Sequence, residues 1–174
     1  AVSHGRLTAA RVFLSRARAI LSAPVAPCDP EAGALLTGEA VSAHHNGDYQ
    51  NVRRLYQQRQ RRLDECHAIS PLSVRSDAYA TLAFNQAELA REIGDVADAE
   101  RLYQRAIDLW TTGLGQNHPF VARALDALAE TLAARGERRK ALALYERAMA
   151  IRVGAFGAEH PDVGWTLTNL GQMA

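Results

Sequence analysis

The side chains that could do chemistry in this sequence do not fall into a pattern that catalysis needs. The six histidines are His4, His44, His45, His67, His118 and His160. His44 and His45 are adjacent, so a helix points them to different faces, and neither has a carboxylate or cysteine at metal-ligand spacing. Serine, aspartate and histidine form no recognisable nucleophile motif, and no glycine-rich loop follows a strand. We therefore expect no catalytic site, no metal site and no cofactor.

A cluster of arginines is the one feature that suggests nucleic acid. Its members are Arg53, Arg54, Arg59, Arg61 and Arg62. No aromatic side chains interleave with them as a base-stacking surface would require, and the net charge of the chain is only +1. We interpret the cluster as the solvated outer face of a helix, and we expect no nucleic-acid partner. No stretch approaches the roughly 20 apolar residues of a membrane span.

A 42-residue repeat organises the second half of the chain. Within residues 91–110 and 134–151 the two segments align at a shift of 42, so that Gly94 falls on Gly136 and Tyr103 on Tyr145. The His-Pro pair that begins at His118 returns in the same way at position 160. Such agreement at one spacing indicates repeated structural units. Because His118 and His160 are equivalent positions at helix starts, we expect both to have structural roles.

The same pattern reaches the first half in weaker form. Gly47 begins a segment that aligns with the one at Gly94, at a slightly longer shift than the repeat itself. Gly5 lies one repeat length before Gly47. The residues after Gly5 that match Ala99, Tyr103 and Ala106 after Gly94 are Ala10, Leu14 and Ala17. The repeat pattern is therefore degenerate in the N-terminal half of the chain and well formed in the C-terminal half.

Within each unit, apolar residues recur every three or four positions, which predicts pairs of amphipathic helices joined by a glycine turn. Each unit then has a first helix before its glycine turn and a second helix after it. We expect pairs of first and second helices at 30–45 with 48–64, 77–92 with 96–112, and 119–134 with 138–153. A second helix without a partner is expected at 6–22, and a first helix without a partner from residue 161. Residues 1–174 then make one array. Its unpaired outer helices have two explanations: the sequence is a piece of a longer array, or these helices cap it.

The marker residues resemble a known family. Leu125 to Ala129, then Gly136, then the segment from Ala141 to Ala148, and finally Gly157 to Pro161 resemble the long tetratricopeptide repeat of kinesin light chains. The resemblance is strong over 76–174 and fainter over 5–64. It implies an all-α fold, a right-handed superhelical array of antiparallel helix pairs. This repeat occurs in many unrelated scaffolds, so it implies function only broadly.

In arrays of this family the first helix of each pair lines a concave groove. The groove candidates are Phe84, Asn85, Glu88, Arg91, Arg123, Asp126, Glu130, Trp165, Asn169 and Gln172. Asn85 and Asn169 match a family asparagine that can hydrogen-bond a bound peptide's backbone, whereas Ala127 departs from it. An ordinary solvated polar face is the alternative interpretation.

We expect a protein-interaction scaffold that binds an extended peptide or a partner helix in this groove, and not an enzyme. A sensor or regulatory repeat domain of a larger signalling or transcription-regulating protein is the alternative. A third hypothesis is an enzyme subunit that supplies only assembly contacts. The identity of the protein or peptide partner does not follow from these residues.

Two cysteines bear on the cellular compartment in which the protein is located. Cys28 precedes the expected helix 30–45, and Cys66 follows the expected helix 48–64. In an antiparallel hairpin the start of the first helix lies beside the end of the second, so we expect a disulfide between them. Such a bond would indicate a periplasmic or secreted protein, since disulfides seldom persist in the cytosol. Without the bond, a cytoplasmic location is the alternative.

Overall fold

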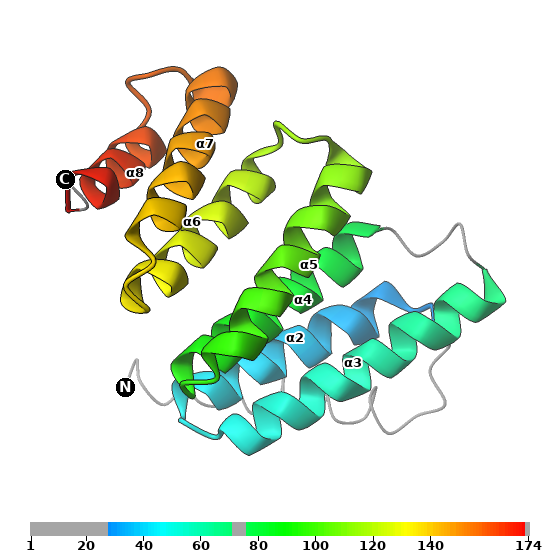
Figure 1. Cartoon of the computed structure of the whole chain (residues 1–174). Coiled ribbons are helices and arrows are strands. Elements are labelled where there is room, and N and C mark those ends of the chain that lie inside the picture. The colour runs from blue at the N-terminus through cyan, green and yellow to red at the C-terminus, as the bar shows by residue number, and fades with distance from the viewer. Residues whose placement is uncertain (1–27, 71–75, 173–174) are drawn as a thin grey trace, which may run out of the picture. The chain divides into compact units, whose positions relative to one another are not determined.

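The computed structural model describes residues 28–70 and 76–172, and every regular element in these ranges is an α-helix (Figure 1). The helices are α2 (Pro30–His45), α3 (Tyr49–Ile69), α4 (Ser76–Glu92), α5 (Val96–Leu114), α6 (Pro119–Ala134), α7 (Arg138–Phe156) and α8 (Pro161–Gln172). The all-α prediction is confirmed. The expected helix 6–22 lies outside the described residues. The chain divides into two compact units, one holding α2 and α3 and the other α4 to α8.

The first unit is a hairpin of α2 and α3. Its core consists of Ala32, Leu36, Ala40 and Ala43 from α2, and of Val52, Leu55, Tyr56 and Cys66 from α3. Asp29 and Asp48 begin the two helices, and each carboxylate accepts a hydrogen bond from a backbone N–H of the first turn. Helix α3 continues to Ile69, so its predicted end at residue 64 was wrong. The next residue, Ser70, precedes a proline and has extended backbone angles, which ends the helix.

In the second unit, helices that are consecutive in the sequence contact one another: α4 with α5, α5 with α6, α6 with α7, and α7 with α8 (Figure 1). Small residues let these helices approach closely. Ala99, Ala106, Ala129, Ala141 and Ala148 are all fully buried. Leu102, Tyr103, Leu125 and Tyr145 fill the remaining space of the same core.

The hairpin turns of the second unit are repeated in detail. Gly94 and Gly136 have φ angles of 82° and 83°, which side chains rarely adopt. After each glycine, the next backbone N–H returns to a carbonyl of the preceding helix: Asp95 N to Ala90 O at 2.8 Å, and Glu137 N to Leu132 O at 2.9 Å. The repeat of the sequence is therefore also a repeat of backbone hydrogen bonds.

The two His-Pro pairs begin α6 and α8. The Nδ1 atom of His118 accepts a hydrogen bond from Phe120 N, and that of His160 accepts one from Asp162 N, both at 3.2 Å. Each imidazole thus satisfies an N–H that the first helical turn leaves without an intrahelical partner. These contacts give His118 and His160 the structural role that their equivalence predicts.

Candidate functional site

The groove candidates lie on α4, α6 and α8 of the second unit. These are the first helices of their pairs, so we call the surface that the candidates were predicted to line the "first-helix face". Arg123 and Trp165 are exposed, and Asn85, Glu88, Arg91, Glu130 and Asn169 are half-buried. Phe84 and Asp126 are buried, with 4% and 2% of their surfaces exposed. The side chain of Gln172 lies outside the described residues. Most of these side chains can therefore meet a ligand, but Phe84 and Asp126 offer it almost no surface.

Phe84 is a core residue that Arg123 covers. Its ring packs edge-on against Tyr103, with 5.6 Å between centroids, and tilted against Trp110 at 5.7 Å. The guanidinium carbon of Arg123 lies 4.3 Å from the centroid of the Phe84 ring, a cation–π contact between α6 and α4. A ligand on this part of the face would meet Arg123 rather than the phenyl ring.

A group of polar side chains, which we call the Glu88 cluster, joins α4, α5 and α6. Its members are Glu88, Arg91, Tyr103 and Glu130. The Tyr103 hydroxyl donates to Glu88, Arg91 Nη2 donates to Glu88 Oε2 at 3.0 Å, and Arg91 Nε donates to the Tyr103 oxygen at 3.3 Å. Burial raises the pKa of the Glu130 carboxyl, which the positive charge of Arg91 opposes. The structure thus brings three predicted groove residues into one electrostatic group.

A buried ion pair joins α6, α7 and α8. Arg152 Nη1 donates to Asp126 Oδ2 and to Thr166 Oγ1, and Arg152 itself is 8% exposed. Arg152 and Thr166 were not among the predicted site residues. A shift by one repeat places Asp126 on Phe84 and Arg152 on Trp110, two residues whose rings are in contact in the structure. An aromatic contact in one repeat is replaced by an ion pair in the next.

The titration of Asp126 gives a testable pH dependence. Burial raises the pKa of its carboxyl from 3.8 to about 6, although Arg152 opposes the rise. The folded state therefore binds this proton more tightly than the unfolded state, so the contribution of Asp126 to stability is largest below about pH 3.8 and is lost as the pH rises to 6. Asp126→Asn removes the titrating group and keeps the shape.

We expect the free energy of unfolding of the wild type, measured relative to Asp126→Asn in urea, to fall across this pH range and to level off above it. A difference that stays constant with pH, or that grows as the pH rises, would contradict this account of Asp126.

Helix α8 carries the remaining candidates. Half of the Trp165 surface is exposed. The Asn169 Nδ2 atom is buried and has no hydrogen-bond partner among the described residues. Two repeat lengths separate Asn85 from Asn169, so both asparagines occupy the same position of their helices. The Asn169 side chain as a whole is half-buried, so its unpaired donor can bond the carbonyl group of a ligand once the side chain turns toward solvent.

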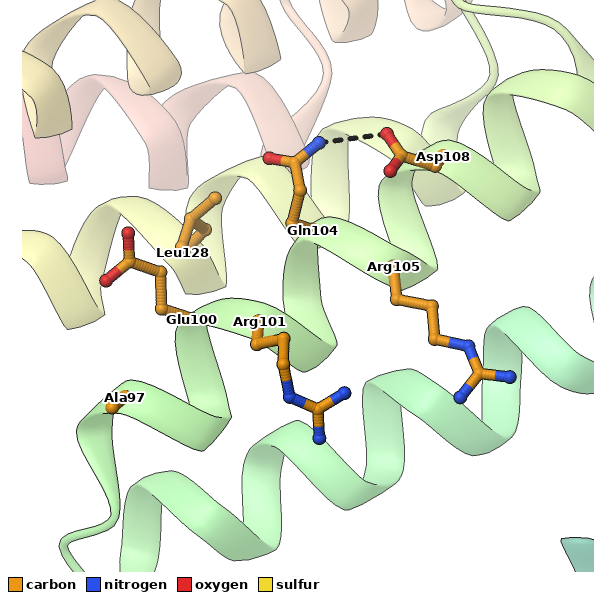
Figure 2. A pocket seen from close by; sticks show the side chains of 7 residues that line it. All are labelled: Ala97, Glu100, Arg101, Gln104, Arg105, Asp108 and Leu128. Atoms are coloured by element: carbon orange, nitrogen blue, oxygen red, sulfur yellow. Dashed lines mark hydrogen bonds between the residues drawn. The ribbon is translucent and has the colours of Figure 1, made fainter.

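The outer side of α5 contains an open hollow of about 440 Å³ that the sequence did not predict (Figure 2). Ala97, Glu100, Arg101, Gln104, Arg105 and Asp108 of α5 line it, together with Leu128 of α6. The Gln104 amide donates to the Asp108 carboxylate at 2.9 Å. Leu128 is itself 4% exposed, so the surface of the hollow comes mainly from the side chains of α5. One of its residues, Gln104, serves below as a control for the first-helix face.

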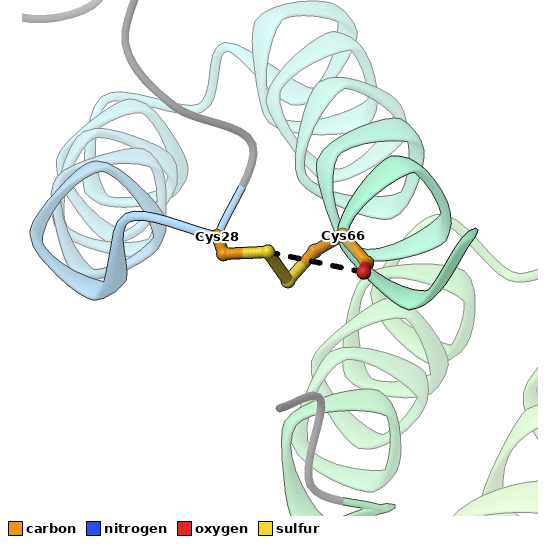
Figure 3. The surroundings of a disulfide bond; sticks show 2 residues. All are labelled: Cys28 and Cys66. Atoms are coloured by element: carbon orange, nitrogen blue, oxygen red, sulfur yellow. Dashed lines mark hydrogen bonds between the residues drawn. A yellow bond between two sulfur atoms is a disulfide. The ribbon is translucent and has the colours of Figure 1, made fainter. Parts of the chain in front are cut away.

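Cys28 and Cys66 form a disulfide in the first unit, with their Cα atoms 4.9 Å apart (Figure 3). Cys28 precedes α2 as expected. Cys66, however, lies within α3 and is 4% exposed, so its predicted place after the helix was wrong. In a chain-entropy account, a bridge across 38 positions contributes roughly 3–4 kcal/mol to stability. The bond fixes the end of the longer helix to the start of its partner.

Over 28–70 and 76–172, no group of three or more His, Cys, Asp or Glu side chains is placed to hold a metal ion. In the same ranges, none of the helices has the length and apolar character needed to cross a membrane.

Comparisons with known proteins agree with the repeat. Residues 78–153 match the tetratricopeptide repeat family. The crystal structure of kinesin light chain nearly identical TPR-like repeats from Podosopora anserina is similar over 83% of this chain, with 22% identity and a TM-score of 0.65. This chain covers 66% of the length of that one. No curated protein sequence matches significantly.

A second solved structure is similar over more of the sequence. BtubC (BKLC) from P. vanneervenii covers 98% of this chain and is itself covered over 82% of its length, with 20% identity and a TM-score of 0.59. At such identities the likeness concerns the fold. We conclude that residues 78–153 match the tetratricopeptide repeat family and that the chain has the fold of kinesin-light-chain-like repeat structures.

Proposed function

We propose that this protein is a non-enzymatic interaction module that binds an extended peptide of a partner protein along the first-helix face. Tetratricopeptide repeats generally mediate contacts between proteins, so the finer proposal concerns the face and the form of the ligand. The observation that carries it is the pair Asn85 and Asn169. They recur at the repeat spacing on the face, and the Nδ2 atom of Asn169 lacks a partner among the described residues.

The chemistry of these side chains suits a main chain. A carboxamide both donates and accepts, so it can bond the N–H and C=O groups of an extended peptide whatever its side chains are. The charged residues between the two asparagines differ in sign. Arg123 lies exposed over the Phe84 ring, whereas Glu88 and Glu130 contribute carboxylates near Arg91. Affinity would then come from the peptide backbone, and preference among sequences from these charges.

Calorimetry with a peptide selected from a random display library on the immobilised protein tests the proposal. We expect Asn85→Ala and Asn169→Ala each to weaken binding by about 1 kcal/mol, roughly fivefold in Kd, because each removes one hydrogen bond. Gln104→Ala, in the hollow on α5, is the matched control and should leave Kd unchanged. Undiminished affinity in the double asparagine variant would place the binding site elsewhere.

A further inference from the structure

Helix α3 of the first unit carries a row of arginines on its outer side. Arg53, Arg54 and Arg61 are exposed, and residues 49–63 contain neither aspartate nor glutamate. Arg54 and Arg61 are seven residues apart, which is about two helical turns or 10 Å along the axis, so they lie on the same side of the helix. The exposed amide of Gln57 lies between them. We call Arg53, Arg54, Gln57 and Arg61 the arginine stripe.

The equivalent face of α5 has the opposite charge at two of these positions. Alignment of the glycine turns that precede the two helices places Arg53 on Glu100. The same alignment places Arg61 on Asp108. Two carboxylates on the outer side of α5 are therefore arginines on α3.

Arg54 keeps the position of its equivalent on α5 but has a neutral partner. On α5, Arg101 Nη2 bonds the Asp98 carboxylate at 2.5 Å. On α3, Arg54 Nη2 donates to the carboxamide of Asn51, the equivalent of Asp98, at 2.8 Å. Both guanidinium groups are held against their helix, but within the described residues no carboxylate pairs with that of Arg54.

Two further arginines add to the positive charge of α3. Arg59 and Arg62, which the sequence predicted for the outer face, are half-buried. Arg59 donates to the neutral hydroxyl of Thr37 on α2. The whole chain has a net charge of +1 and residues 49–63 contribute five positive charges, so the remaining residues sum to −4. The positive charge of the chain is therefore concentrated on this one helix.

The dimensions of the stripe favour one class of anionic partner. A nucleic-acid duplex or a membrane surface extends well beyond one helix and would also meet the negative remainder of the chain. An acidic helix needs only the stripe. Its carboxylates recur about every 10 Å when they are seven residues apart, which is the spacing of Arg54 and Arg61.

We propose that the arginine stripe binds an acidic helix of a partner protein, through carboxylates that are seven residues apart on that helix. The stripe belongs to the first unit, whereas the first-helix face belongs to the second. The contact is therefore independent of the peptide binding proposed above.

Calorimetry at low salt with two stapled helical peptides of the same alanine-rich composition tests the proposal. One peptide carries its glutamates on a single side, seven residues apart, and the other distributes them around the helix. We expect the one-sided peptide to bind about fivefold more tightly, because its carboxylates match the stripe. Its affinity should fall as the sodium chloride concentration rises to about 0.5 M, since salt screens exposed charges.

Variants locate the contact on the protein. Arg54→Gln combined with Arg61→Gln should weaken binding of the one-sided peptide by about fivefold to tenfold. The matched control is Arg105→Gln combined with Arg147→Gln, which removes two exposed arginines from equivalent positions of α5 and α7 and should leave Kd unchanged. Arg54→Glu combined with Arg61→Glu should instead bind a peptide that has lysines in place of the glutamates. Arginines that only supported the fold would not give this reversal.

Four results with the peptides would each overturn the proposal: no measurable binding of the one-sided peptide, equal affinity for the two peptides, an equal loss in the control variant, or no binding of the lysine peptide by the charge-reversed variant. Duplex DNA or phosphatidylserine vesicles that bound more tightly than the one-sided peptide, and lost this binding in the Arg54→Gln, Arg61→Gln variant, would also overturn it. The stripe would then serve another class of partner.

Discussion

Tyr145→Ala lowers the free energy of unfolding by about 3–5 kcal/mol, because it removes an aromatic ring from a core that cannot close over the cavity. Tyr145 is 3% exposed and lies among the buried residues that α6 and α7 share. Burial raises the pKa of its hydroxyl to about 12, in agreement with a ring largely withdrawn from water. Urea denaturation followed by circular dichroism measures the loss.

Leu142→Ala is the matched control on the same helix. Leu142 is 38% exposed, so its removal leaves little cavity and should change stability by less than about 1 kcal/mol. If the two variants unfolded at the same urea concentration, Tyr145 would not be a core residue and the repeat register would be wrong.

Arg152→Ala should also lower stability by about 3–5 kcal/mol at neutral pH, since it leaves the buried Asp126 carboxylate without its positive partner. The repeat suggests a compensating change. Asp126→Phe combined with Arg152→Trp recreates the pair that Phe84 and Trp110 form one repeat earlier, with ring centroids 5.7 Å apart. We expect the double variant to regain most of the stability that Arg152→Ala loses.

Urea denaturation of the three proteins checks both statements. An Arg152→Ala protein as stable as the wild type would show that the ion pair contributes nothing. A double variant less stable than Arg152→Ala would show that the two repeats do not share the same packing at these positions.

The helix boundaries were predictable because particular residue types mark them in the sequence. Gly94 and Gly136 end first helices with the same hydrogen bonds, and His118 and His160 begin the next ones. These markers act locally, so spacing alone locates them. The end of α3 lacks such a glycine, and the predicted boundary there fell short. That error placed Cys66 outside the helix although the disulfide pairing itself was anticipated.

The first-helix face was harder to predict, since polarity does not reveal burial. Asp126 was assigned to the groove by its position relative to the apolar stripe, yet it is buried with Arg152, a residue on another helix. Phe84 was assigned there by position, yet its ring lies in the core beneath Arg123. The burial of both residues depends on side chains from neighbouring helices, which the periodicity of a single helix does not include. Once the contact of Phe84 with Trp110 is known, comparison of equivalent positions in successive repeats links Asp126 to Arg152.

The fluorescence of Trp165 tests the proposed binding face most directly. The chain has two tryptophans, and Trp110 is 2% exposed whereas Trp165 is 50% exposed on α8. A display-selected peptide without tryptophan or tyrosine should shift the emission to shorter wavelength and saturate at the Kd found by calorimetry. Trp165→Phe should lack the shift. A peptide that binds with a measurable heat but leaves the emission of the wild type unchanged would contradict binding along the first-helix face.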